Sequence, residues 1–241
     1  MTGIGTIVNS VAVIIGCIIG LVIKKGFSPR FEDIIMKGVG LSVVFIGLSG
    51  ALAGIMTFDN GKFGTTGTML MIFSLVIGSI IGEALRIEDR LENLGEGIKK
   101  RVKVSGDNSR FVEGFVTYTL LICVGAMAIV GSLNDGLLND PTMLYTKAAL
   151  DFVSGIVFAS TLGVGTLFAV IPMAIYQGLI TFCADFIKPY LTDALISDMG
   201  YVGSILIFAI GINLAFGKKF KTGNMLPSIL IPIIYNLIFV K

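Results

Sequence analysis

Asp151 is the residue of this sequence best placed to do chemistry, because its carboxyl group lies about eight residues inside a predicted membrane span, 143–162. A carboxylate at membrane depth costs about 2.5–3.5 kcal/mol on insertion scales and normally faces a bundle interior, a partner or water. Lys147 lies one helical turn earlier, so an ion pair between positions i and i+4 is an equally supported interpretation. The two interpretations are compatible, since a paired carboxylate can still exchange a proton or a cation.

The residues after Asp151 are unusually rich in hydroxyls and glycines. Hydroxyls in membrane helices often bond only to their own backbone. Closely spaced glycine and proline residues can instead break a helix and free backbone carbonyls to hold an ion or solute. We therefore predict an ion-binding or substrate-binding region around Asp151, formed by Ser154, Ser160, Thr161, Gly163, Gly165, Thr166 and Gln177, with Asn9 and Asn213 as further candidates from other apolar stretches. For the two asparagines, interhelical hydrogen bonding is the simpler interpretation.

Composition places the chain among membrane proteins. Of its 241 residues, 54% are apolar and 14% charged, and the mean hydropathy is +0.92, whereas a soluble domain carries about 25% charged residues. The net charge of +2 is too small to suggest a nucleic-acid partner. Histidine is absent and the three cysteines form no Cys-x-x-Cys pair, so we expect no metal, no cofactor and no enzymatic activity.

The elements that must position these residues are membrane-spanning helices, each needing about 20 mostly apolar residues. The sequence predicts an all-α, polytopic helical bundle forming a single transmembrane domain over 1–241. About eight spans are expected, at 4–23, 37–56, 67–85, 111–132, 143–162, 167–187, 201–217 and 225–240.

The distribution of basic residues predicts the orientation, because cytosolic loops are enriched in lysine and arginine. With the N-terminus outside, 14 of the 18 basic residues fall in cytosolic connections, and the remaining four are Lys62, Lys147, Lys188 and Lys241. Both termini are then external, in a multi-pass protein of a bacterial cytoplasmic (inner) membrane. The pattern of apolar and charged residues in the cytosolic connector 85–104 predicts an amphipathic helix on the membrane surface.

Two arrangements remain open for 143–187, which must leave the outer face and return without a charged cytosolic loop. Two full spans joined by a tight turn near Gly163 would satisfy the pattern. A broken helix or re-entrant hairpin near 155–172 would also satisfy it, provided that protein shields the backbone or a polar cavity surrounds it.

An internal repeat is suggested by similar segments in successive apolar stretches. Ile14–Gly20 resembles Val76–Gly82, and Gly50–Ala53 resembles Gly125–Ala128. The first four spans are thus expected to form tandem helical hairpins. The Gly-x-x-x-Gly pairs also have a simpler explanation, which is close helix packing.

The chain resembles the YdfK/YqgA-like family of uncharacterised bacterial integral membrane proteins, a domain-of-unknown-function family. The resemblance is carried by Gly5–Asn9, Leu121–Gly131, Lys147–Asp151, Ala159–Gly165 and Tyr176–Gly178. It covers essentially the whole chain and implies a polytopic membrane protein without appended domains. It implies no activity.

The residues favour a secondary transporter of a small polar solute or ion, in which Asp151 binds the coupling proton or cation. Membrane lipids and the solute would be its partners, together with a second copy in a homodimer. One alternative is an accessory or sensory membrane protein that binds a cytosolic partner through 85–104. An ion channel is another, although no filter sequence or charged ring is evident.

Overall fold

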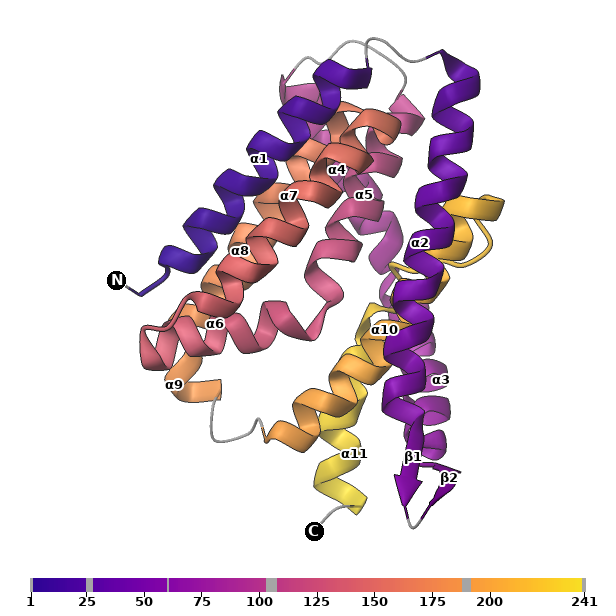
Figure 1. Cartoon of the computed structure of the whole chain (residues 1–241), viewed down its shortest axis with the longest axis vertical. Coiled ribbons are helices and arrows are strands. Elements are labelled where there is room, and N and C mark those ends of the chain that lie inside the picture. Colours follow the sequence, from indigo (N-terminus) through magenta and orange to yellow (C-terminus); the bar gives the residue numbers. More distant parts are fainter. Residues whose placement is uncertain (1, 25–27, 60, 103–107, 188–191, 240–241) are drawn as a thin grey trace. The chain divides into compact units, whose positions relative to one another are not determined.

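The computed structural model describes residues 2–24, 28–59, 61–102, 108–187 and 192–239, and these residues are predominantly helical (Figure 1). The predicted all-α, polytopic helical bundle is confirmed. Four of the basic residues used for the orientation, Lys25, Lys103, Lys188 and Lys241, lie outside the described residues.

Each predicted span overlaps one or more helices, although two of these helices begin eight residues before the predicted span. The helices are α1 (Ile4–Lys24), α2 (Pro29–Ile55), α3 (Thr68–Leu85), α4 (Ile87–Val102), α5 (Asn108–Val124), α6 (Ala126–Leu138), α7 (Thr142–Leu162), α8 (Val170–Phe182), α9 (Ala184–Ile187), α10 (Asp193–Phe216) and α11 (Ile231–Phe239). The 3₁₀ helices η1 (Val164–Ala169) and η3 (Leu226–Leu230) precede α8 and α11. Strands β1 (Met56–Asp59) and β2 (Lys62–Thr65) form an antiparallel hairpin with Met56 opposite Thr65.

Six described helices are long and apolar enough to cross a membrane: α1, α2, α3, α7, η1 with α8, and α10. The predicted span at 111–132 is a bent pair instead, since α5 and α6 meet at 60° around Gly125, and it counts as a seventh candidate. The predicted span at 225–240 corresponds to a shorter apolar helix over Leu226–Asn236. The expected count of eight thus depends on these two segments.

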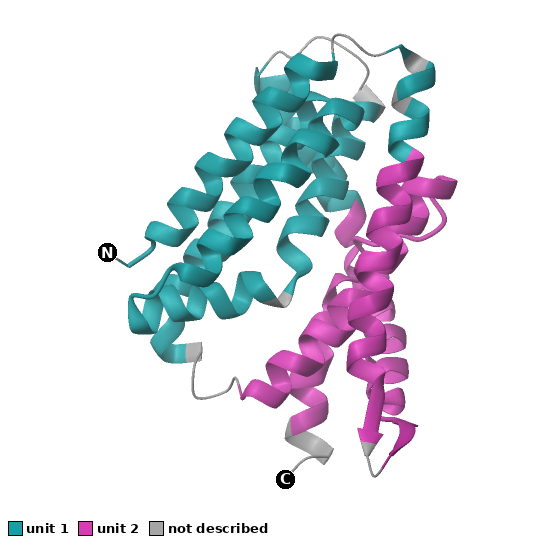
Figure 2. Ribbon diagram, in the orientation of Figure 1, with its two compact units in different colours: residues 1–36, 89–190 teal, residues 37–88, 191–241 magenta. Residues whose placement is uncertain are grey.

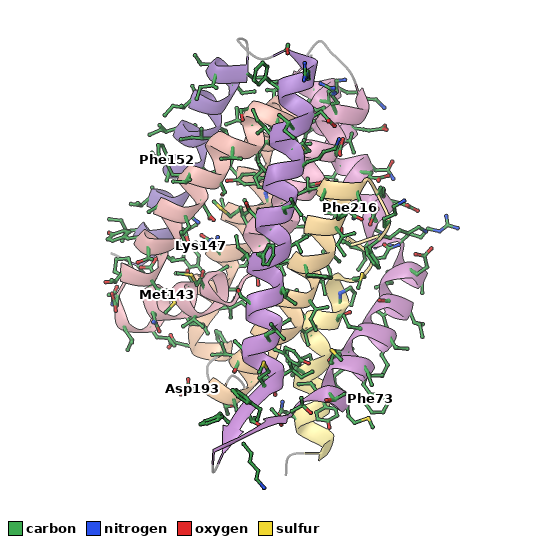
Figure 3. The ribbon with its side chains drawn as sticks, turned by 45° about the vertical axis from the view of Figure 1, so that its right-hand side comes forward. Phe73, Met143, Lys147, Phe152, Asp193 and Phe216 are labelled. Atoms are coloured by element: carbon green, nitrogen blue, oxygen red, sulfur yellow. The ribbon has the colours of Figure 1, made fainter. Side chains whose placement is uncertain are left out.

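The chain divides into two compact units, each built from two separate stretches of sequence (Figure 2). Unit 1 comprises residues 1–36 and 89–190, and unit 2 comprises residues 37–88 and 191–241. The outward faces of the helices carry large apolar side chains such as Phe73 and Phe216 in unit 2 (Figure 3), as expected for surfaces in contact with lipid.

In unit 1, α1 and α7 run parallel in the most extensive pairing of helices. Their backbones approach closely because Gly16 and Gly20 face the carbonyl oxygens of Phe152 and Ile156, where an added Cβ would overlap. This is the small-residue packing typical of membrane helices.

The open question of 143–187 is resolved in favour of two helices joined by a tight turn. α7 ends at Leu162, and Gly163 adopts φ +88° and ψ −156°, a conformation open essentially only to glycine. The chain then reverses through η1 into α8. Accordingly, Lys24 at the end of α1 contacts Thr161, while Asn9 near its start contacts Gln177.

In unit 2, α2 packs antiparallel against α10, where Gly40 faces Ala215 and Gly54 faces Tyr201. On α3, Gly78 and Gly82 face η3 and the loop before it. The glycine pairs Gly16/Gly20 of α1 and Gly78/Gly82 of α3 thus both allow close packing. However, α1 packs against a parallel helix, whereas α3 packs against an antiparallel segment. The tandem repeat stays a prediction.

A polar junction joins the start of α4 to the 217–225 loop within unit 2. The buried Glu88 accepts from Lys218 Nζ at 2.6 Å and from the Gly223 N–H at 3.0 Å. Asn224 accepts from the Glu88 N–H and donates to Glu83. The predicted helix 85–104 is present as α4, with residues 103–104 outside the described part.

Candidate functional site: a buried polar cluster in unit 1

Asp151 is the centre of a buried polar cluster. Its Oδ2 accepts from Lys147 Nζ at 2.5 Å and from Asn9 Nδ2 at 3.0 Å. The three residues are 6%, 5% and 0% exposed respectively. The carboxylate is thus paired at i, i+4, as the structural interpretation expected, and it is also held by a second helix. Its role in binding an ion or a solute stays a prediction.

Helix α8 adds two further side chains to this cluster. Asn9 Nδ2 lies 3.4 Å from Gln177 Oε1 and 3.5 Å from Met173 Sδ. Residues four apart share one face of a helix, so α8 presents Met173 and Gln177 together, just as α7 presents Lys147 and Asp151 (Figure 3 labels Lys147). Three helices therefore meet at Asn9.

Tyr118 and Ser154 fix the backbone of α7 beside the carboxylate. Tyr118 Oη donates to the Asp151 carbonyl oxygen at 2.7 Å and lies 3.2 Å from Ser154 Oγ. Its ring stacks on Phe158 at a centroid distance of 5.3 Å. The fully buried Tyr118 thus couples α5 to the turn of α7 that carries Asp151.

The cluster combines an ion pair of zero net charge with two amide groups that each have an unused hydrogen-bonding atom. The Lys147 ammonium and the Asp151 carboxylate stabilise each other away from water, because an unpaired buried charge is strongly destabilising. Within the described part of the chain, Asn9 Oδ1 and Gln177 Nε2 are buried and have no partner. Native proteins rarely leave such groups unpaired, so the site offers one free acceptor and one free donor beside an ion pair.

The remaining predicted residues of α7 and η1 lie away from the carboxylate. Ser160 and Thr161 donate to carbonyls of their own helix, as hydroxyls in membrane helices commonly do. Gly163 forms the turn, and Gly165 allows η1 to pack directly against the Phe111 carbonyl. Thr166 is fully buried and its hydroxyl has no partner among the described residues.

Asn213 belongs to a different structure in unit 2. Its Oδ1 accepts from the backbone N–H groups of Lys219 and Phe220, and its Nδ2 donates to the Phe220 carbonyl. Asn213 therefore closes the loop after α10 and does not join the cluster.

Sequence reasoning missed Asp135, a fully buried carboxylate on α6. Its Oδ2 accepts from the Gly5 N–H at 3.0 Å, and its Oδ1 has no partner in the described structure. The sequence Asn134-Asp135-Gly136 is typical of a loop after a span ending at 132, which concealed the residue. Among the described residues, no three histidine, cysteine or acidic side chains form a group that could hold a metal.

Comparisons with known proteins show the family of the chain and its relatives. A family model described as "Protein of unknown function (DUF554)" matches residues 4–237. The chain is 36% identical over 228 residues to "Uncharacterized membrane protein YdfK" of Bacillus subtilis (strain 168), covering 95% of this chain and 93% of that protein. It is 26% identical over 231 residues to "Uncharacterized protein YqgA" of Escherichia coli (strain K12), covering 95% and 94%. No solved structure matches the chain significantly.

Proposed function

We propose that this chain, which belongs to the DUF554 family of membrane proteins, is a secondary transporter of a small polar solute or ion across the bacterial cytoplasmic membrane. Asp151 would bind the coupling proton or cation. The observation that carries the proposal is the buried ion pair of Asp151 with Lys147, bonded to Asn9 of a second helix. Ionisable residues within spanning segments typically mark ion or substrate pathways.

The ion pair provides a way to couple binding to a change of conformation. When a proton or cation binds Asp151, the Lys147 ammonium loses its counter-charge while it remains buried. That state is unfavourable unless Lys147 meets water or an anionic group. Two arrangements of the same helices would thus be favoured in turn, as alternating access requires.

The unpaired amide groups support a polar solute. Asn9 Oδ1 offers an acceptor and Gln177 Nε2 a donor, both on the side chains that surround Asp151. A solute carrying hydroxyl, amide or amino groups would satisfy both. The bend at Gly125 adds support, because interrupted helices are a common feature of transporter sites.

Several further assignments belong to the same proposal. The protein would act without a cofactor and without enzymatic chemistry, with both termini external and as a homodimer. The exposed apolar faces of the helices offer surface to lipid or to a second copy. Mass photometry in nanodiscs tests the dimer, and a monomer in every lipid would contradict it.

The test of transport uses purified protein in proteoliposomes with a panel of amino acids, organic acids and cations. We expect saturable uptake of at least one compound, lost in Asp151→Asn. Asp140→Asn is the matched control, because Asp140 lies in the exposed turn between α6 and α7. Hydrogen bonds from the Thr142 hydroxyl and backbone N–H hold the pKa of Asp140 below its ordinary value, so it stays charged throughout the assay.

Each outcome separates the candidate functions. Uptake that Asp151→Asn leaves unchanged would remove Asp151 from the mechanism. Unsaturable currents under an applied voltage would indicate a channel. No flux of any compound would contradict transport and favour an accessory protein that binds a cytosolic partner through α4.

A further inference from the structure

We propose that Asp135 is a second proton-exchanging carboxylate, through which protons reach the Asp151–Lys147 pair from the end of unit 1 where α1 begins. The inference rests on the proposed transport function and names the proton as its coupling ion. It is carried by the burial of Asp135, by its hydrogen bond to the Gly5 N–H and by the packing of Leu144 beside it.

Asp135 has structural support for both of its protonation states. In the charged state, Oδ2 accepts the Gly5 N–H in the first turn of α1, where the helix dipole favours negative charge. The other oxygen, Oδ1, is buried and has no partner among the described residues. An unsolvated carboxylate oxygen is costly, and binding of a proton removes the buried charge.

Asp135 and Asp151 accept hydrogen bonds from consecutive turns of α1. Asp135 bonds the backbone of Gly5, and Asp151 bonds the side chain of Asn9. These two positions of α1 are four residues apart, which is about 6 Å along the helix axis. The two carboxylates therefore lie at successive levels of unit 1, with Asp135 nearer the start of α1.

Leu144 of α7 packs at the level of Asp135, because both side chains lie beside Gly5 of α1. It is fully buried and packs against Gly5 of α1 and Gly131 of α6 so tightly that a Cβ added at either glycine would lie 2.6 Å or 2.9 Å from its side chain. Gly131 lies one turn before Asp135 on α6, and Lys147 lies one turn after Leu144 on α7. In the proposed route, a proton that leaves Asp135 for the ion pair passes the apolar side chain of Leu144.

The charged surroundings of Asp135 are simple. Of the elements packed against α6, α7 carries Lys147 and Asp151, and α9 carries the exposed Asp185. Helix α1 contributes the Gly5 N–H, and α8 contributes the Thr181 hydroxyl, which bonds the Ser132 carbonyl. The charged residues of α1 and α5 lie at the opposite ends of those helices.

The proposed proton transfer involves only side chains of unit 1 and water. Asp135 accepts a proton from a hydronium ion at the start of α1 and becomes a neutral carboxylic acid, leaving water. When Leu144 moves aside, Asp135 gives the proton to Asp151 and becomes a carboxylate again. Asp151 is then neutral, and the Lys147 ammonium is released from its ion pair.

The test measures passive proton flux into liposomes that contain a pH-sensitive dye, with no solute present. Leu144→Ala removes the barrier, and we expect the flux to rise about tenfold over wild type, as a barrier lowered by about 1.4 kcal/mol would give. Leu144→Ala combined with Asp135→Asn should return the flux to the wild-type level. Asparagine keeps an oxygen for the Gly5 N–H, so the fold is retained. Leu206→Ala, at a buried leucine of unit 2, controls for loosened packing.

The result that would overturn the inference is a flux in Leu144→Ala that Asp135→Asn leaves unchanged, or no increase at all. A second measurement uses the wild-type protein, so it is independent of any folding defect. A hydrophobic carbodiimide adds to protonated carboxyl groups, and peptide mass spectrometry should find Asp135 labelled increasingly as the pH falls. Labelling that never reaches Asp135 at any pH would contradict the proposal.

The two proposals fail in distinguishable ways. Solute uptake that responds to a pH gradient equally in wild type and Asp135→Asn would exclude Asp135 and retain the transporter. Proton flux that depends on Asp135, with no uptake of any compound in the panel, would exclude the transporter and retain the proton site.

Discussion

Asn9 of α1 donates a 3.0 Å hydrogen bond to Asp151 of α7, although 142 positions separate the two residues in the chain. The same amide nitrogen lies within 3.4 Å of Gln177 on α8. One small side chain therefore links three helices of unit 1 at the level of the buried charge pair. A motion that separates α1 from α8 must break this contact, so the site and the arrangement of the helices are coupled.

The Lys147–Asp151 pair should show strong energetic coupling. Lys147→Met leaves the Asp151 carboxylate buried without its counter-charge, and we expect it to lower the free energy of unfolding by about 3–5 kcal/mol. Adding Asp151→Asn removes the remaining charge and should recover part of that loss. Detergent-denaturation curves of the two single variants and the double variant measure the coupling. Strictly additive effects would show that the two side chains do not interact.

Close packing of α1 on α7 should make Gly16 intolerant of any side chain. Gly16→Ala places a methyl group against the Phe152 carbonyl, and overpacking of this kind typically costs about 1–3 kcal/mol. Gly178→Ala is the matched control in the same unit, since no atom lies within 4 Å of the added methyl. Thermal unfolding should separate the two variants. Equal melting temperatures would mean that the two helices pack less closely than described.

The turn at Gly163 should depend on its backbone conformation. Gly163→Ala forces an L-residue into φ +88°, at a cost of order 1–3 kcal/mol. Gly125→Ala is a suitable control, because Gly125 also separates two helices but has φ −70° and open space around it. We expect a lower melting temperature for Gly163→Ala only. A stable Gly163→Ala variant would argue against the tight turn between α7 and η1.

The buried Glu88 should matter more for stability than Glu96, a partly exposed glutamate of the same helix. Glu88→Ala leaves the Gly223 N–H without its acceptor and removes the ion pair between Glu88 and Lys218, and a buried unsatisfied group costs about 1–3 kcal/mol. Glu96→Ala removes an exposed i, i+4 pair with Lys100, worth about 0.3–0.5 kcal/mol. Chemical denaturation of both variants tests the difference. A larger effect at Glu96 would contradict the assignment of the junction.

The fold was largely predictable because spanning helices have a strong signal in apolar length. The bounds of α1, α3 and α7 agree with the predicted spans to within one or two residues at each end. The bend between α5 and α6 was not predicted, since one glycine in an apolar stretch does not indicate a break and no proline marks it. The division into two units was also missed, because it depends on contacts between stretches far apart in the sequence.

The candidate site was predictable only where a local rule applies. The Lys147–Asp151 pair follows from helical spacing, and Asn9 stood out as an amide in apolar surroundings. The same rule indicated Asn213, which instead holds the loop after α10. Tyr118 looked like an ordinary aromatic residue of a span, and nothing local indicates that its hydroxyl reaches the backbone of α7. Ser160 and Thr161 looked like site residues because the sequence does not reveal that their hydroxyls bond their own helix.

The distance along the chain between Asn9 and Asp151 has a consequence for how the protein enters the membrane. At about 5–20 residues per second, α1 leaves the ribosome on the order of ten seconds before α7 is complete. During that time Asn9 has no access to Asp151, and an isolated amide in lipid is tolerated at modest cost. Asp151, in contrast, is synthesised one helical turn after Lys147. The Asp151 carboxylate can therefore pair with the Lys147 ammonium while α7 is being inserted into the membrane.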